Sequence, residues 1–169
     1  AYFAGGCFWC TESIFQRVKG VSSVIPGYMG GYIKNPSYHE VCSGKTGHTE
    51  TIKITYDKNI ISYSKLLEIF FFTHDPTKLN RQGNDVGTQY RSAVFFENQS
   101  EKKQILESIS IFEKKKIYNE SFVTEINKKI EFYDAETEHH DYYNQNKSQS
   151  YCQFVIRPKI KKFENLLNK

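Results

Sequence analysis

The sequence lacks a long apolar run and a recognisable secretory signal. No uninterrupted apolar stretch approaches the ~18 residues that a membrane-spanning helix requires, so we expect no membrane span. Because no signal peptide is visible either, we expect a cytoplasmic protein. The chain opens on Ala rather than Met, which leaves open whether an upstream segment or a fused domain precedes it.

Internal repeats, domain linkers and low-complexity tracts are also missing. The formal net charge at pH 7 is only +4, and the lysine clusters near residues 113–116 and 157–162 are typical of solvated faces. We therefore expect no nucleic acid as a partner. A chain of 169 residues suits one domain with a sizeable core. We predict a single domain over residues 1–169 that acts as a monomer, with a more mobile segment from about residue 144.

Only four cysteines are present, too few for a dense disulfide scaffold in a domain of this size. Cys7 and Cys10 form a C-x-x-C pair, which indicates redox chemistry or a metal. A structural zinc site usually needs a second such pair or a matching pair of histidines. Because His139 and His140 are adjacent rather than at ligand spacing, we expect no metal. A zinc-binding or non-enzymatic redox module remains an alternative.

Cys7 lies where an apolar strand meets a helix. Residues 1–4 are apolar, Gly5 and Gly6 permit a tight turn, and residues 11–18 carry apolar side chains at helical spacing. The unpaired N–H groups and the dipole of a helix N-terminus favour a thiolate. We therefore predict that Cys7 is a nucleophile with a depressed pKa. The alternative is a cysteine buried in the core.

Residues 50–56 alternate between polar and apolar side chains and are the clearest strand in the sequence. The alternation places Glu50 on the same face as Ile52 and Ile54, whereas Thr51 and Thr55 are expected to face solvent. A carboxylate at the end of an apolar strand face is partly desolvated, which raises its pKa. We predict that Glu50 serves as a general acid. The alternative is a carboxylate that reaches water.

The remaining pattern predicts an α+β fold. Further strands are expected at 21–28, 92–96, 122–126 and 129–133, and helices at 63–74, 100–116 and 134–143. Residues 29–48 form a long irregular stretch, which we interpret as a packed binding loop. Because strands and helices alternate irregularly, we predict a two-layer sandwich of helices on a mixed or antiparallel sheet, with a ferredoxin-like core and long loops.

Six stretches carry a family resemblance: residues 6–9 (GCFW), 35–44 (NPSYHEVCSG), 46–50 (TGHTE), 81–92 (RQGNDVGTQYRS), 135–142 and 151–152 (YC). In this order, over almost the whole chain, they resemble the motifs of the A-type peptide methionine sulfoxide reductases. The resemblance implies reduction of methionine S-sulfoxide, free or in oxidised proteins, to methionine. Such a site needs a thiolate nucleophile, an acid at the sulfoxide oxygen and an apolar slot for the methyl group.

Cys7 and Glu50 match the nucleophile and the acid of that family. Attack by Cys7 at the sulfoxide sulfur would release methionine and leave a sulfenic acid, which condenses with a second thiol to a disulfide. The resemblance implies that thioredoxin recycles the disulfide and that no cofactor is needed. A C-x-x-C thiol–disulfide oxidoreductase remains an alternative, although it would not need Glu50 on an apolar strand face.

Four aromatic side chains and one carboxylate complete the site that the resemblance implies. Phe8 and Trp9 match the wall that receives the methyl group. Tyr38 and Tyr90 match the hydroxyls that bind the sulfoxide oxygen, and Asp85 matches a polar residue that supports them.

Cys152 and Cys10 are the candidate resolving thiols. The family commonly uses cysteines of a glycine-rich C-terminal tail, and Cys152 stands at the matching place without a following glycine. Side chains three apart on a helix have Cβ atoms about 5–6 Å apart, whereas a disulfide needs about 3.5–4.5 Å. Because the polar stretch 144–150 could carry Cys152 over the site, we expect Cys152 to react first. Cys10 is then a substitute or a relay.

Overall fold

The computed structural model describes residues 1–168. Its strands are β1 (Tyr2–Ala4), β2 (Val21–Met29), β3 (Thr49–Tyr56), β4 (Arg81–Gln82), β5 (Asp85–Val86), β6 (Ala93–Phe96), β7 (Glu125–Lys128) and β8 (Tyr133–Asp134). Its α-helices are α1 (Phe8–Phe15), α2 (Tyr38–Cys42), α3 (Tyr63–Thr73), α4 (Gln99–Lys114), α5 (Tyr142–Gln145) and α6 (Arg157–Leu167). Two 3-10 turns, η1 (Thr88–Tyr90) and η2 (Thr137–His139), and a π-helical turn, η3 (Cys152–Ile156), complete the chain. None of the helices in the described part is long and apolar enough to cross a bilayer.

The central sheet has six strands in the order β7-β6-β1-β3-β2-β8. The inner four are antiparallel neighbours, and together with α1 and α3 they form the β-α-β-β-α-β unit of a ferredoxin-like core. β7 pairs parallel to β6, whereas β8 pairs antiparallel to β2 at the other edge. β4 and β5 form a separate ribbon. The predicted α+β class and mixed sheet are confirmed.

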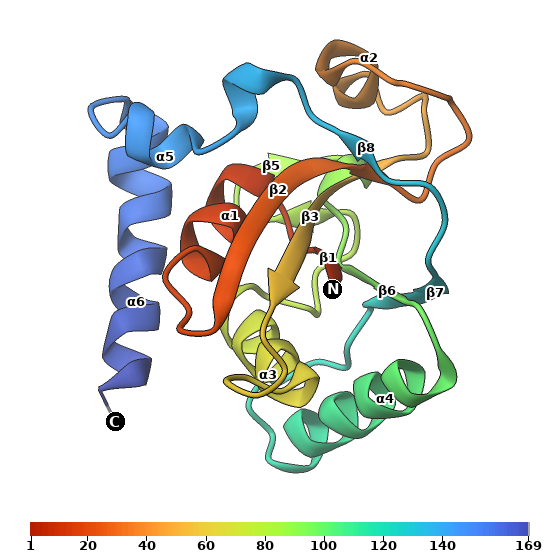
Figure 1. Ribbon diagram of the computed structural model, residues 1–169, viewed down its shortest axis with the longest axis vertical. Helices are drawn as coiled ribbons and strands as arrows, with labels where there is room; N and C mark the ends of the chain where they lie inside the picture. Colours follow the sequence, from red (N-terminus) through yellow and green to blue (C-terminus); the bar gives the residue numbers. More distant parts are fainter. Residues whose placement is uncertain (169) are drawn as a thin grey trace.

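The main core lies between this sheet and the helices. Phe3 of β1 stacks on Phe70 of α3 with ring centroids 4.8 Å apart, and Phe15 of α1 meets Phe3 edge to face. Figure 1 shows α6 running alongside α1 and α3 beside α4. Helix α1 is therefore enclosed by sheet and helix, which holds its N-terminus in one place.

The opposite face of the sheet carries a smaller apolar cluster, formed by Tyr2, Ala4, Met29, Ala93 and Phe95. Because this cluster covers the middle of β3, Thr51 is fully buried, and the prediction that it faces solvent is wrong. Thr55, nearer the end of the strand, is exposed as predicted.

The irregular segments contain more structure than the sequence predicts. Loop 29–48 includes α2, which begins with a capping box between Ser37 and Glu40. The strands expected at 122–126 and 129–133 are displaced to β7 and β8, and the helix expected at 134–143 is replaced by η2 and α5. These short elements surround the predicted site residues.

The basic C-terminal stretch is an amphipathic helix. Cys152, Ile156, Ile160 and Phe163 follow one another at helical spacing and are buried, while the lysines between them face outward or sit at the edge. The segment from about residue 144, which we predict to be more mobile, contains the end of α5, then η3 and α6.

Candidate active site

Cys7 is the N-cap of α1. Its backbone is extended, with φ −61° and ψ 126°, and its carbonyl accepts the N–H of Cys10 at 3.0 Å. Gly6 before it has a φ of +89°, and a Cβ there would come within 2.7 Å of the Gln82 side chain. The strand-to-helix turn predicted from the sequence is thus present, and it requires glycine.

The side chain of Glu50, on β3, extends to the N-terminus of α1. Its Oε1 accepts the backbone N–H of Phe8 at 3.0 Å, whereas its Oε2 is buried and has no hydrogen-bond partner in residues 1–168. The side chain is almost completely buried. Burial raises the pKa of Glu50 to about 8, although the Phe8 N–H opposes this shift. The predicted face, burial and raised pKa of Glu50 all agree with the structure.

The Cys7 and Cys10 thiols titrate as an interacting pair. Burial, a hydrogen bond with Cys10 and the charge of Glu50 raise the pKa of Cys7. The hydrogen bond from Cys7 lowers the pKa of Cys10 to about 7. The expectation of a depressed Cys7 pKa therefore disagrees with the structure, because desolvation by burial outweighs the helix N-terminus.

Tyr38 of α2 and Tyr90 of η1 approach Glu50 from two further elements. Burial first, and then the charge of Glu50, raise the pKa of both tyrosines, so both hydroxyls remain protonated donors. The Tyr38 ring stacks on the fully buried Phe8 ring with centroids 6.2 Å apart. The structure thus gathers Cys7, Glu50 and both predicted tyrosines around one buried point.

Glu136, which the sequence reasoning did not single out, holds Tyr38 in position. One of its carboxylate oxygens accepts the hydroxyl of Tyr28 at 2.9 Å, and the other accepts the backbone N–H of Tyr38 at 2.9 Å. Its only signal in the sequence is its place in a family motif.

Trp9 is half-buried and forms one edge of the site. Its indole N–H donates to Nδ1 of His139 at 3.1 Å, and its ring stacks on Tyr142 with centroids 3.8 Å apart and planes inclined by 8°. Phe8, Tyr38 and His139 lie within 6.5 Å of it, centroid to centroid. These rings form an apolar surface beside Cys7, as expected for a methyl-binding wall.

Asp85 meets the C-terminal segment rather than Glu50 directly. Its Oδ2 accepts the hydroxyl of Tyr151 at 2.6 Å, and that hydroxyl lies 3.6 Å from Sγ of Cys10. Tyr151 therefore links the β4–β5 ribbon, α1 and η3. The sequence offered only its position next to Cys152 as a signal.

The other two cysteines occupy different environments. Cys152 is fully buried in η3, where burial first and the charge of Cys10 second raise its pKa. Cys42 is half-buried at the end of α2, and burial raises its pKa while a hydrogen bond from Tyr38 opposes the rise. All four cysteines are free thiols.

One cluster has the composition of a metal site. Ligand atoms of Glu136, Glu138 and His139 lie within 4.8 Å of one another. However, Nδ1 of His139 accepts the Trp9 indole N–H, which places the imidazole proton on Nε2 and leaves no free nitrogen lone pair. Both oxygens of Glu136 are already hydrogen-bonded. The donor set therefore does not fit a metal.

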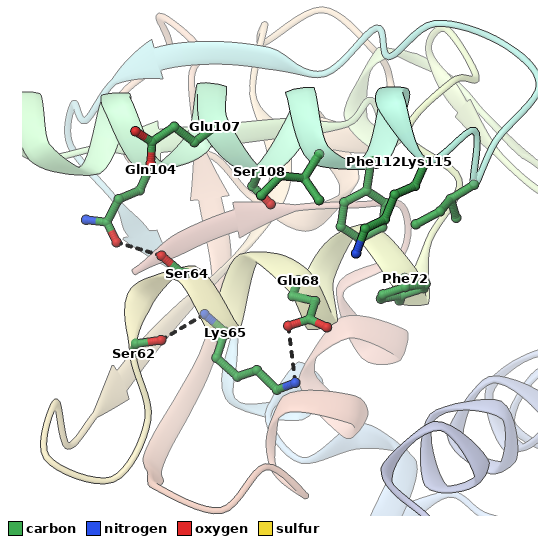
Figure 2. A pocket seen from close by; sticks show the side chains of 12 residues that line it. Ser62, Ser64, Lys65, Glu68, Phe72, Gln104, Glu107, Ser108, Phe112 and Lys115 are labelled. Atoms are coloured by element: carbon green, nitrogen blue, oxygen red, sulfur yellow. Dashed lines mark hydrogen bonds and ion pairs between the residues drawn. The ribbon is translucent and has the colours of Figure 1, made fainter. Parts of the chain in front are cut away.

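A groove of about 400 Å³ between α3 and α4 is separate from this site. Figure 2 shows Ser64 bonded to Gln104 across the groove and Lys65 paired with Glu68 along α3. None of the groove-lining residues belongs to the predicted site.

The whole chain, residues 1–169, matches the family described as peptide methionine sulfoxide reductase. The chain belongs to this family. A peptide methionine sulfoxide reductase MsrA of Saccharolobus solfataricus is 53% identical to it over 166 residues, which cover 98% of this chain and 93% of the relative. The reductase is thus an oxidoreductase that acts on methionine sulfoxide.

Solved structures have the same fold. Mxr1 from Saccharomyces cerevisiae in reduced form superposes with a TM-score of 0.83 at 31% identity, covering 89% of the reductase and 87% of Mxr1. Mxr1 in complex with Trx2 gives a TM-score of 0.59 at 22% identity, covering 83% and 81% of the two chains. The resemblance read from the motifs is confirmed.

Proposed function

We propose that the reductase converts the S epimer of methionine sulfoxide, free or in oxidised proteins, to methionine by thiol chemistry at Cys7. The observation that carries this proposal is the pairing of a buried thiol with a buried carboxyl group whose Oε2 is unpartnered. A carboxyl group with a pKa of about 8 is mostly protonated at neutral pH. Its Oε2–H is therefore available to a sulfoxide oxygen.

In the first step, the sulfoxide oxygen accepts hydrogen bonds from Glu50, Tyr38 and Tyr90. These donors withdraw electrons from the sulfur, which makes it electrophilic. The Cys7 sulfur attacks the sulfoxide sulfur and forms an S–S bond, while the oxygen, protonated by Glu50, leaves as water. Water then attacks the Cys7 sulfur, the S–S bond breaks with its electron pair going to methionine sulfur, and the proton of the water returns to Glu50. The products are methionine and Cys7 sulfenic acid, so methionine sulfur is reduced by two electrons and Cys7 is oxidised by two.

Cys10 supplies the base for this attack. Burial raises the pKa of the Cys7 thiol, and a thiol is a much poorer nucleophile than a thiolate. The Cys10 thiolate, hydrogen-bonded to Cys7 and with a pKa of about 7, accepts the Cys7 proton as Cys7 attacks. This role needs no depressed pKa at Cys7 itself.

Cys10 also resolves the sulfenic acid, which reverses the order expected from the sequence. Its sulfur attacks the Cys7 sulfur and displaces hydroxide, which takes a proton and leaves as water, so a Cys7–Cys10 disulfide forms. The Cys7 and Cys10 thiols are near enough to shift each other's pKa, whereas Cys152 is buried in a helical turn. Cys152 then acts second, by exchange with this disulfide.

Thioredoxin is the proposed reductant of the final disulfide. Yeast Mxr1, a structural relative at 31% identity, is also known in a complex with the thioredoxin Trx2. Every residue assigned to the site comes from one chain, so a monomer suffices, and the reaction requires no cofactor. Asp85 and Tyr151 support Cys10, while Phe8 and Trp9 receive the methyl group.

The test is a single-turnover stoichiometry. Fully reduced enzyme, with no added reductant, is mixed with excess methionine S-sulfoxide or R-sulfoxide, and methionine and free thiols are counted. The proposal predicts two thiols lost per methionine formed, with the S epimer only. Thiol loss without methionine would instead indicate a thiol–disulfide oxidoreductase, and equal reaction of both epimers would contradict the stereochemistry.

A further inference from the structure

Helix α1 carries a second buried carboxylate that the proposed chemistry does not use. Glu12 follows Cys7 by five residues and is 2% exposed. Its Oε1 accepts the backbone N–H of Tyr142 at 3.3 Å. Burying a charged group destabilises the folded protein unless hydrogen bonds compensate for the lost hydration.

The backbone that Glu12 hydrogen-bonds belongs to Tyr142, whose ring lies against the indole of Trp9. Tyr142 is the first residue of α5 and stacks on Trp9 in a nearly parallel arrangement. Figure 1 shows α5 beside the red-coloured α1. Two elements distant in the sequence thus meet at one aromatic pair.

Asp141, the residue before Tyr142, has a φ of +55°, in the left-handed region that Asp adopts more readily than most residues. Its side chain accepts from Gln16, the residue after α1, at 3.1 Å and from Asn144 at 2.7 Å. These contacts join the turn before Tyr142 to the end of α1.

We propose that Glu12 is a positioning residue for the methyl-binding wall. By accepting the backbone N–H of Tyr142, it fixes the Tyr142 ring, and the Tyr142 ring fixes the Trp9 indole. Glu12 touches neither the substrate nor the reacting atoms. This inference rests on the proposed role of Trp9 as the wall for the substrate methyl group.

A purely structural role for Glu12 makes a different prediction. Arg17, two residues after the end of α1, joins the same region of the chain to α5 by donating to Asn144 and by lying over the Tyr143 ring. No hydrogen bond or cation–π contact joins it to Tyr142 or Trp9 within residues 1–168. If Glu12 only tied α5 to α1, then Arg17→Met and Glu12→Gln would have similar effects.

The spectroscopic arm of the test uses the single Trp of the chain, which is Trp9. Glu12→Gln keeps the size of the side chain, removes the negative charge that strengthens the bond to the Tyr142 N–H, and replaces one acceptor oxygen with a donor. We expect Glu12→Gln and Tyr142→Leu to shift the Trp9 emission and its near-ultraviolet circular dichroism. Arg17→Met is expected to lower the melting temperature and leave both signals unchanged.

The kinetic arm measures the first turnover at increasing methionine S-sulfoxide. For Glu12→Gln we expect the concentration at half-maximal burst rate to rise on the order of fivefold, the effect of about one lost hydrogen bond. The maximal burst rate is expected to change by less than about twofold, because the groups that stabilise the transition state are intact.

The double variant Glu12→Gln/Tyr142→Leu decides whether Glu12 acts through Tyr142. We expect the double variant to bind substrate no more weakly than Tyr142→Leu alone, because Tyr142→Leu already removes the ring that Glu12 positions. Additive losses, or an unshifted Trp9 signal in Glu12→Gln, would overturn the proposal. The optical signals need no turnover, so they remain readable even if the assignment of Trp9 to the methyl group fails.

Discussion

The backbone N–H of Phe8 and the carboxyl group of Glu50 are joined by a hydrogen bond of 3.0 Å that uses only one carboxyl oxygen. The other oxygen faces the site without a partner in residues 1–168. The N-terminus of α1 therefore orients the Glu50 carboxyl group and occupies one of its oxygens. In the reaction we propose, the second oxygen meets the sulfoxide.

Glu50→Gln should keep substrate binding and lose rate. The amide can still accept from Phe8 and hydrogen-bond the sulfoxide oxygen, but it cannot deliver a proton. We expect the burst rate of methionine formation to fall on the order of 10²-fold or more, with little change in half-saturation. Glu138→Gln, which alters an exposed carboxylate, is the matched control and should react normally. An unchanged rate in Glu50→Gln at pH 7 would make Glu50 structural.

The burst rate should depend on pH in a bell-shaped manner. The rate rises as the Cys10 thiolate forms, near pH 7, and falls as Glu50 loses its proton, near pH 8. In Glu50→Gln the fall at high pH should disappear. In Cys10→Ser the rise should move to higher pH, since Cys7 must then ionise with its raised pKa. A Cys10→Ser profile that matches the wild type would remove Cys10 from the first step.

Stability should also depend on Glu50. Its pKa in the folded state, about 8, lies above its unfolded value of about 4.5, so the folded protein binds the extra proton between these pH values. The free energy of unfolding therefore falls as pH rises through this range, by about 1.4 kcal/mol per unit of pKa shift. Urea denaturation at pH 5 and pH 8 should show Glu50→Gln becoming more stable relative to the wild type at the higher pH. A constant difference would mean that Glu50 titrates normally.

The first disulfide should join Cys7 and Cys10. After one equivalent of methionine S-sulfoxide, rapid acid quenching and peptide mapping should show this bond before any bond to Cys152. Cys152→Ser should still form one methionine and one Cys7–Cys10 bond. If a Cys7–Cys152 bond appeared first in the wild type, the order expected from the sequence would be right.

The parts of the site that depend on local pattern could be predicted. Glu50 was found because a strand with one buried face fixes which side chains share that face. Cys7 was found because glycines before a helical pattern define a turn. The ionisation of the thiols could not be predicted in this way. It depends on how completely the rest of the fold buries Cys7, and on the proximity of Cys10.

The contacts that position the site come from distant parts of the chain. Glu136 binds the backbone of Tyr38, 98 residues earlier, and Tyr151 meets Asp85, 66 residues earlier. Local periodicity in the sequence cannot predict contacts between residues so far apart in the chain.

The burial of helix α6 was missed for a different reason. Its apolar residues recur at helical spacing in the sequence, but the lysines between them favoured the interpretation of a solvated face.

The most direct test of the account is a burst measurement on the four single cysteine-to-serine variants, with excess dithiothreitol present. We predict that the variants at Cys10, Cys42 and Cys152 still form methionine from the S-sulfoxide, because dithiothreitol can reduce a sulfenic acid on Cys7. Cys7→Ser should form none above the rate without enzyme. Methionine formation by Cys7→Ser, with Cys10→Ser inactive instead, would contradict the assignment of the nucleophile.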